Sequence, residues 1–247
     1  MTAAVVDSVN KFIAAGGAVE DVEEHGLLSR VVATLRDEPD FTDHLVGALR
    51  LVETAIVEGV SVESLRTLSV AEAIAVAMMV TDTGNESVQL NGCRSLIYLC
   101  GTVDGLAEVM AQEGLPEHVM DLVGGASGKA SAAVVKAAMY LVTSMCTEPG
   151  QAEAIKAKGG LSVLLPAVAS NSTKSEFREV CSELVESINA ESEMTRLIDE
   201  LPQLLTKAQE QKTVAAAQEL SIAVQSMNAL SVVVSNAEAI ATEHTLL

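Results

Sequence analysis

The chain has 247 residues, of which 34 are acidic and 15 basic, giving a formal net charge of −19. Hydrophobic residues make up 49% of it but aromatic residues only 2%, which favours helices packed through small and aliphatic side chains over a β-sandwich. The acidity argues against direct binding of nucleic acid, which needs clustered Lys and Arg, and makes a basic or mixed-charge protein segment the better electrostatic match.

The N-terminal stretch MTAAVVDSVNKF has no basic segment ahead of an apolar one, so it does not resemble a secretory signal. No apolar run approaches the roughly 18 residues of a membrane span. Four cysteines, Cys93, Cys100, Cys146 and Cys181, lie inside apolar helical patterns without a CxxC pair. We therefore expect a cytoplasmic or nuclear protein with core thiols, no disulfide framework and no membrane span.

A short amphipathic stretch followed by a break and a Leu recurs along the chain. Its clearest copies are GLAEVMAQEGL (105–115), GQAEAIKAKGGL (150–161), ESEMTRLIDEL (191–201) and NAEAIATEHTL (236–246), and weaker copies lie at 19–28 and 62–70. The marker leucines are 41, 47, 46, 40 and 45 residues apart: Leu27, Leu68, Leu115, Leu161, Leu201 and Leu246. Such intervals are typical of helical repeats of about 40 to 47 residues.

Each unit is predicted to hold three helices. The stretch above is the first helix. A second helix follows the marker Leu at 27–35, 115–123 and 161–169, and after a polar linker a longer third helix is expected at 44–56, 88–100, 134–146, 177–188 and 214–227. Asn85 is placed to cap one third helix, and Gly26, Gly114 and Gly160 suit the tight turn between first and second helices.

The centres of the third helices carry small residues: Gly47 and Ala48, Gly92 and Cys93, Ala137 and Ala138. Small side chains let neighbouring helices approach closely. We therefore predict that the repeats stack through these positions, and that a larger side chain there would force the stack apart.

The chain resembles the armadillo repeat family along its whole length. The resemblance rests on the repeat interval, on the V-Q at the start of the third helix 88–100 and on the Gly before a second helix. HEAT repeats are the near alternative. The resemblance implies an all-α, right-handed superhelix of about five repeats, in a single domain over residues 1–247. VVDSVNKFIAAGG at the start resembles the tail of a third helix and NAEAIATEHTLL at the end a first helix, so partial repeats are expected at both ends.

Catalytic and metal-binding patterns are not found. The histidines His25, His44, His118 and His244 fall in polar positions of separate repeats and are expected at the surface. GGASGKA (124–130) lacks the spacing of a phosphate-binding loop and no strand precedes it, so it is predicted to be a linker. We expect no enzymatic activity, no cofactor and no metal.

In armadillo proteins the third helices line a concave groove, where a repeated Asn, preceded four residues earlier by Trp, holds an extended peptide by its backbone. The resemblance places Glu53, Tyr98, Ser144 and Glu186 at the Asn position and Leu49, Arg94, Tyr140 and Ser182 at the Trp position. Neither Asn nor Trp is present there, which argues against capture by an Asn ladder. The candidate groove residues are Glu53, Arg94, Tyr98, Tyr140, Ser144 and Glu186.

The function expected from these features is a non-enzymatic scaffold or adaptor that binds a protein segment along the groove, with the tyrosines as anchors. One alternative is a docking or regulatory module of a larger assembly, which predicts apolar end faces and self-association through the open ends. A second alternative is a cargo or chaperone-type adaptor.

Overall fold

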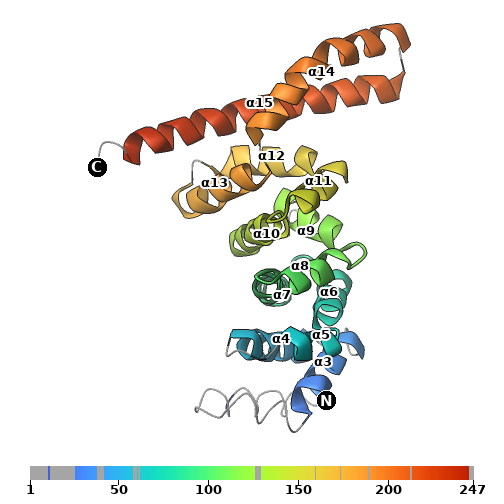
Figure 1. Cartoon of the computed structure of the whole chain (residues 1–247), viewed down its shortest axis with the longest axis vertical. Coiled ribbons are helices and arrows are strands. Elements are labelled where there is room, and N and C mark those ends of the chain that lie inside the picture. Colours follow the sequence, from blue (N-terminus) through green and yellow to red (C-terminus); the bar gives the residue numbers. More distant parts are fainter. Residues whose placement is uncertain are drawn as a thin grey trace. The chain divides into compact units, whose positions relative to one another are not determined.

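The computed structural model describes residues 26–37, 42–57, 62–125, 129–158, 160–172, 174–188, 190–211 and 213–244, together with Lys11 and Val60. Across these residues the chain forms thirteen α-helices, α3 to α15, one short 3-10 turn and no strand, which confirms the all-α prediction (Figure 1). Internal contacts divide the chain into two compact units, Met1–Met145 and Cys146–Leu247. The single domain expected over residues 1–247 stays a prediction.

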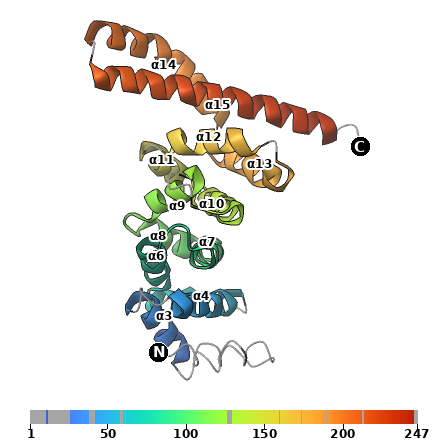
Figure 2. The same cartoon turned by 180° about the vertical axis from the view of Figure 1, so that it is seen from behind.

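Unit 1 is built from two layers of helices. Its elements are α3 (Leu27–Asp37), α4 (Thr42–Val57), α5 (Val62–Thr67), α6 (Val70–Val80), α7 (Glu86–Cys100), α8 (Val103–Met110), α9 (Leu115–Gly124) and α10 (Ala132–Met145). The third helices α4, α7 and α10 follow one another on one side, and the shorter helices lie on the other (Figures 1 and 2). Helix α7 packs against both α4 and α10. The predicted helices 27–35, 44–56, 88–100, 115–123 and 134–146 are all present within these elements.

The core of unit 1 lies between the two layers. Helix α6 shows this best, because it is apolar on nearly every side and is in contact with α3, α7, α8 and α9. A soluble helix that is apolar all round is buried. Its buried residues are Val70, Ala71, Ala73, Ile74, Ala75, Ala77 and Met78.

The turns that lead into the second helices share a left-handed backbone. Gly26 and Gly114 have φ of 65° and 78°, as expected for glycines at such turns. Ser69 occupies the same place before α6 with φ 53°, which is costly for a residue with a Cβ atom. Gly160 differs from the prediction. Its φ of −55° is right-handed helical, so the turn before the helix Leu161–Asn171 does not use the left-handed conformation that favours glycine.

Gly92 marks the closest helix approach that the sequence predicted. A Cβ atom added there would lie 2.5 Å from both Cγ and Sδ of Met78, which is fully buried on α6. The neighbour is therefore the second helix of the same repeat. The prediction of a close approach at Gly92 is confirmed. The helix that comes close is α6, however, and not the third helix of a neighbouring repeat as expected from stacking.

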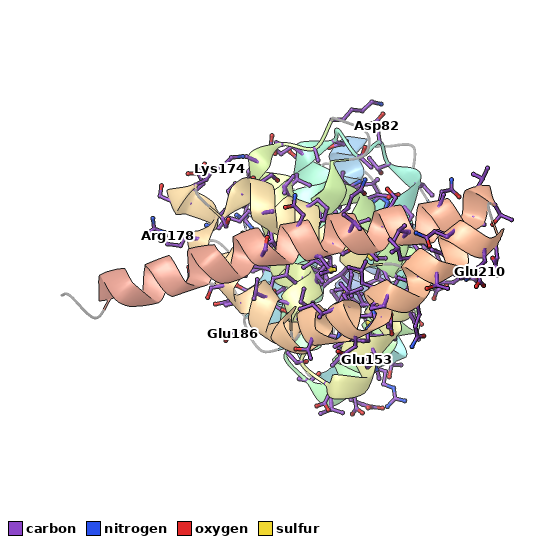
Figure 3. The ribbon with its side chains drawn as sticks, turned by 90° about the horizontal axis from the view of Figure 1, so that it is seen from above. Asp82, Glu153, Lys174, Arg178, Glu186 and Glu210 are labelled. Carbon is purple, nitrogen blue, oxygen red and sulfur yellow. The ribbon has the colours of Figure 1, made fainter. Side chains whose placement is uncertain are left out.

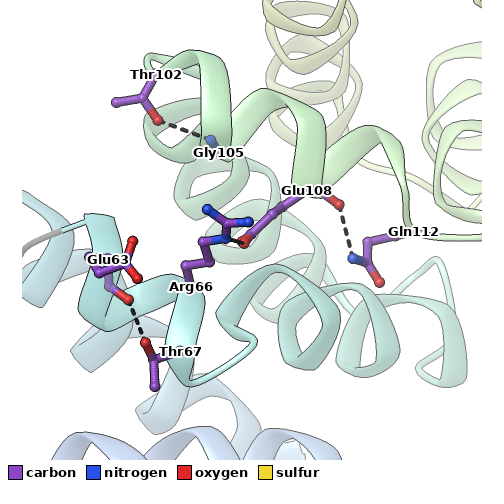
Figure 4. Close-up of polar contacts among 7 residues, drawn as sticks. All are labelled: Glu63, Arg66, Thr67, Thr102, Gly105, Glu108 and Gln112. Atoms are coloured by element: carbon purple, nitrogen blue, oxygen red, sulfur yellow. Dashed lines mark hydrogen bonds and ion pairs between the residues drawn. The ribbon is translucent and has the colours of Figure 1, made fainter.

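The first helices of successive repeats are joined by charged and polar side chains (Figure 4). The guanidinium Nε of Arg66 on α5 lies 3.2 Å from Oε1 of Glu108 on α8. Thr102 caps α8 by accepting a hydrogen bond from the backbone N–H of Gly105 at 3.1 Å. Such exposed ion pairs add little stability, about 0–1 kcal/mol, but this pair helps to align α5 with α8 within unit 1.

Unit 2 begins with the expected three-helix pattern. Its elements are α11 (Pro149–Ala157), α12 (Leu161–Asn171), η1 (Ser175–Phe177), α13 (Arg178–Ser187), α14 (Ala190–Gln211) and α15 (Val214–His244). The predicted helices 161–169 and 177–188 are present as α12 and as η1 with α13. Helix α15 packs against both α12 and α14.

The fifth repeat departs from the prediction. The break expected at Leu201 is absent, and α14 continues through it; the separate helices expected at 214–227 and 236–246 form the single 31-residue helix α15. The chain has no glycine after Gly160, so no residue suited to a left-handed turn precedes Leu201. Pro202 is exposed on α14, and the apolar spacing continues across it from Leu197. The last two helices are therefore a long hairpin, and the partial repeats expected at the two ends stay a prediction.

Candidate functional site

The third helices of unit 1 share one pattern of buried and exposed positions. Their buried residues match when Ala48, Gly92 and Ala138 are placed at the same position. In that register the inward set of α4 is Leu45, Ala48, Leu49, Leu51, Val52 and Ala55, that of α7 is Gln89, Gly92, Cys93, Ser95, Leu96 and Leu99, and that of α10 is Val135, Ala138, Met139, Leu141, Val142 and Met145, of which Val135 alone is half-buried.

This register corrects the alignment of α4 by one residue. Leu49, which the sequence alignment placed on the groove, is fully buried and faces the core. Arg50 is exposed in its place, and Thr54 lies one helical turn further on. Glu53 is half-buried and corresponds to Ile97 of α7, so it lies one residue before the outward-facing position of Thr54.

The same register supports the pairing of α7 with α10. Arg94 is equivalent to Tyr140, and Tyr98 is equivalent to Ser144, as the sequence alignment had them. Arg94 is exposed and Tyr98 has half of its surface exposed, although it is among the largest apolar side chains of the unit. Four of the six candidate groove residues therefore lie at matching outward positions of two packed helices; their binding role stays a prediction.

Tyr140 is held by its own helix. The Lys136 Nζ atom lies 5.9 Å from the centroid of the Tyr140 ring, within the range of a cation–π contact. Ser144 donates a hydrogen bond from Oγ to the Tyr140 carbonyl oxygen at 3.0 Å. Both Tyr140 and Ser144 are half-buried, so they line the surface less prominently than Tyr98. Arg50 was missed because the sequence alignment identified outward positions from small residues, which occur twice in the centre of α4. Lys136 was missed because it lies one turn before Tyr140, at a position that the alignment did not consider.

Glu186 lies in unit 2, on α13, where it is exposed (Figure 3). The inward residues of α13 and the turn before it are Phe177, Val180, Cys181, Leu184 and Ile188. Their spacing matches α10 with Cys181 at the position of Ala138. Glu183 and Ser187 then correspond to Tyr140 and Ser144, and Glu186 stands one residue away, as Glu53 does in α4.

A buried polar network joins three helices of unit 1. The fully buried Gln89 donates from Nε2 to the carbonyl oxygens of Met78 at 3.0 Å and Thr81 at 3.3 Å, so its Oε1 is left to accept from His118 Nε2, 3.0 Å away. His118 is half-buried on α9, and the prediction of a surface histidine is wrong there. Desolvation lowers the pKa of His118, and the nearby Asp121 carboxylate opposes this in part.

The other three histidines cannot be compared with their predictions. His25 lies outside the described residues, and the side chains of His44 and His244 are not described.

All four cysteines are buried and free, as predicted for core thiols. Burial raises the pKa of Cys93 and Cys100 to about 12 and that of Cys146 and Cys181 to about 11. A thiolate is the reactive form of cysteine, and these environments disfavour it. Among the described residues no group of three His, Cys, Asp or Glu side chains is placed to hold a metal ion, and no described helix is long and apolar enough to cross a membrane.

The comparisons with known proteins bear on the fold alone. No protein-family model matches the chain, and no curated protein sequence matches it. A crystal structure of an engineered protein from the Northeast Structural Genomics Consortium is similar, with a TM-score of 0.58 and 17% sequence identity over 87% of this chain and 83% of that one. The described part of the chain is all-helical, and its arrangement is compatible with a helical repeat fold.

Proposed function

We propose that this protein is a non-enzymatic interaction scaffold of the armadillo-like type, which binds a protein segment across its third helices. The observation that carries the proposal is the exposed pair Arg94 and Tyr98 on α7, at positions matched on α10 by Tyr140 and Ser144. Tyr and Arg are the residue types most enriched where interfaces gain their binding energy. Both side chains are therefore of the kind that a partner would contact.

The armadillo-like subtype is supported by the details of the repeat. Left-handed residues precede the second helices at Gly26, Ser69 and Gly114, and Gln89 at the start of a third helix satisfies the carbonyl groups at the end of the second. HEAT-like repeats remain the alternative, and a right-handed superhelix of the whole chain is part of this proposal.

The absence of catalysis is also proposed. The buried thiols are poor nucleophiles because their pKa values are raised, and His118, the one histidine whose side chain is described, bonds to an amide that is itself held by two carbonyl groups. The free, buried cysteines are consistent with a reducing compartment such as the cytoplasm or nucleus.

Affinity capture followed by direct binding tests the scaffold proposal. Partners recovered with the full chain are purified and titrated against it, against a variant carrying Arg94→Ala, Tyr98→Ala and Tyr140→Ala, and against Val103→Ala. Val103 serves as a control because it is 74% exposed at the start of α8 and is not one of the outward-facing residues of the third helices. We expect the triple variant to bind at least tenfold more weakly and the control to bind normally. Equal binding of every partner to all three proteins would reject the scaffold proposal.

A docking module of a larger assembly is the second candidate. Of the nine large apolar side chains exposed among the described residues, five lie on the last two helices: Ile198, Leu205, Val214, Ile222 and Val224. Exposed apolar side chains that gather on one surface mark an interaction site, so these two helices are the candidate docking surface. The test is size-exclusion chromatography with light scattering on the full chain and on Ile222→Glu. Concentration-dependent self-association that Ile222→Glu abolishes would favour this candidate, and a monomer at all concentrations would count against it.

A further inference from the structure

We infer that the outward row of unit 1 binds an acidic protein segment. This row, called the Arg–Tyr row below, consists of Arg50, Thr54, Arg94, Tyr98, Lys136, Tyr140 and Ser144 on α4, α7 and α10. The inference rests on the proposed scaffold function and adds the chemistry of the partner.

The first support is the separation of charge within unit 1. The described charged side chains of the third helices are three basic and two acidic: Arg50, Arg94, Lys136, Glu53 and Glu86; α4 also carries Asp43, whose side chain is not described. Those of α3, α5, α6, α8, α9 and the turns beside them are four basic and nine acidic: Arg30, Arg36, Arg66, Lys129, Asp37, Glu63, Glu72, Asp82, Asp104, Glu108, Glu113, Glu117 and Asp121. The Arg–Tyr row itself holds no described acidic side chain.

This separation reverses the expectation drawn from net charge. The charge of −19 favours a basic partner only if it is spread evenly over the surface. Exposed charges are screened beyond about 8 Å at physiological ionic strength, so a segment lying on the third helices responds mainly to the side chains of those helices. The described charges of the Arg–Tyr row, Arg50, Arg94 and Lys136, are basic, and an acidic segment is their complement.

The second support is the kind of side chain in the row. An arginine guanidinium binds a carboxylate through two parallel hydrogen bonds, and an exposed tyrosine offers apolar area with a polar tip. Arg94 and Tyr98 are four residues apart and share one face of α7, as Lys136 and Tyr140 do on α10. Each of the three helices thus contributes one basic group, and two of them add an aromatic ring beside it.

The spacing of the helices also limits the partner. Packed helices have axes about 8–10 Å apart, and an extended chain advances about 3.3 Å per residue. A segment that crosses α4, α7 and α10 therefore meets a new helix at about every third residue. The expected ligand is an extended segment with Asp or Glu at roughly that interval.

The experiment is selection from a displayed library of random 12-residue peptides on the full chain, followed by titration of the enriched peptides as synthetic probes. The test variant is Arg50→Glu with Arg94→Glu. The control is Arg30→Glu with Lys158→Glu, which changes the net charge equally at exposed positions outside the row. Arg50→Gln with Arg94→Gln serves as a milder pair, and circular dichroism confirms that all variants are helical. A single-stranded oligonucleotide is included as a competitor.

The expected result is enrichment of peptides with acidic residues at about every third position, at least tenfold weaker binding to the test variant, and less than a twofold change in the control. Enriched peptides that are neutral or basic, yet lost on Tyr98→Ala, would overturn the charge inference and leave the scaffold proposal standing. Enrichment of nothing, or equal binding to every variant, would overturn both. Displacement of the peptides by the oligonucleotide would also overturn the inference, because the row would then bind phosphate chains.

Discussion

Replacing Gly92 by alanine tests how closely α7 rests on α6. Two opposing effects decide the outcome. Alanine favours a helix over glycine by about 1 kcal/mol. Against this, the new methyl group would lie 2.5 Å from Cγ and Sδ of Met78, whereas carbon atoms rest about 3.5–4.0 Å apart. Overpacking a dense core costs about 1–3 kcal/mol, and an overlap of about 1 Å with a fully buried side chain puts this substitution at about 2–3 kcal/mol. After the helix gain is subtracted, we expect Gly92→Ala to lower the free energy of unfolding by about 1–2 kcal/mol.

Urea unfolding followed by circular dichroism measures this loss. With an m-value of about 2–3 kcal/mol/M, the midpoint should fall by about 0.5 M. Gly150→Ala is the control, because glycine is again replaced within a helix but nothing lies within 4 Å of the added atom. That variant should be as stable as the native protein or slightly more stable.

A double-mutant cycle identifies Met78 as the cause. Met78→Ala alone should cost about 2–5 kcal/mol, because it leaves a cavity in the core. In the double variant the methyl group introduced by Gly92→Ala enters the vacated space, so the combined loss should be smaller than the sum of the single losses by about 1–3 kcal/mol. If Gly92→Ala proves neutral or stabilising, or if the two losses simply add, the close approach of α7 and α6 described above is wrong.

Three further predictions concern unit 1. Ser69→Gly should raise the free energy of unfolding by about 0.5–1 kcal/mol in urea titrations, because the cost of a left-handed serine exceeds the extra chain entropy of glycine; no gain would contradict the strain. Ser95→Ala should stabilise by about 1 kcal/mol and raise Tm by about 2–4 °C, because the buried Ser95 Oγ has no hydrogen-bond partner; a loss would mean that the hydroxyl is satisfied. The pKa of His118 is lowered below 6.5 in the folded state, so the unfolded chain binds more protons and stability should decline as pH falls through 6.5. His118→Gln should show a smaller decline between pH 7.5 and 5.5, and identical pH profiles would refute the assignment.

Most helices between residues 27 and 188 could be predicted from the sequence because their signals are local, although α6 was not among the predicted second helices. Apolar spacing defines each helix, and a glycine or a polar linker ends it, as Gly114 does before α9. The small centre of α7 was equally readable, since Gly92 is the only glycine inside that helix. The absence of glycine after Gly160 was also visible, and it signals the long hairpin that the repeat interval concealed.

What the sequence by itself determined, then, is the helical class, the helical pattern up to Leu161 and the close approach of helices at Gly92. The tertiary structure decided which side chains face outward, because a one-residue shift turns a helix by about 100° and only contact with α7 shows that Arg50, not Leu49, is exposed. It also decided where charge gathers. Net charge is a sum over the chain, whereas the basic Arg–Tyr row exists only because packing places α4, α7 and α10 side by side.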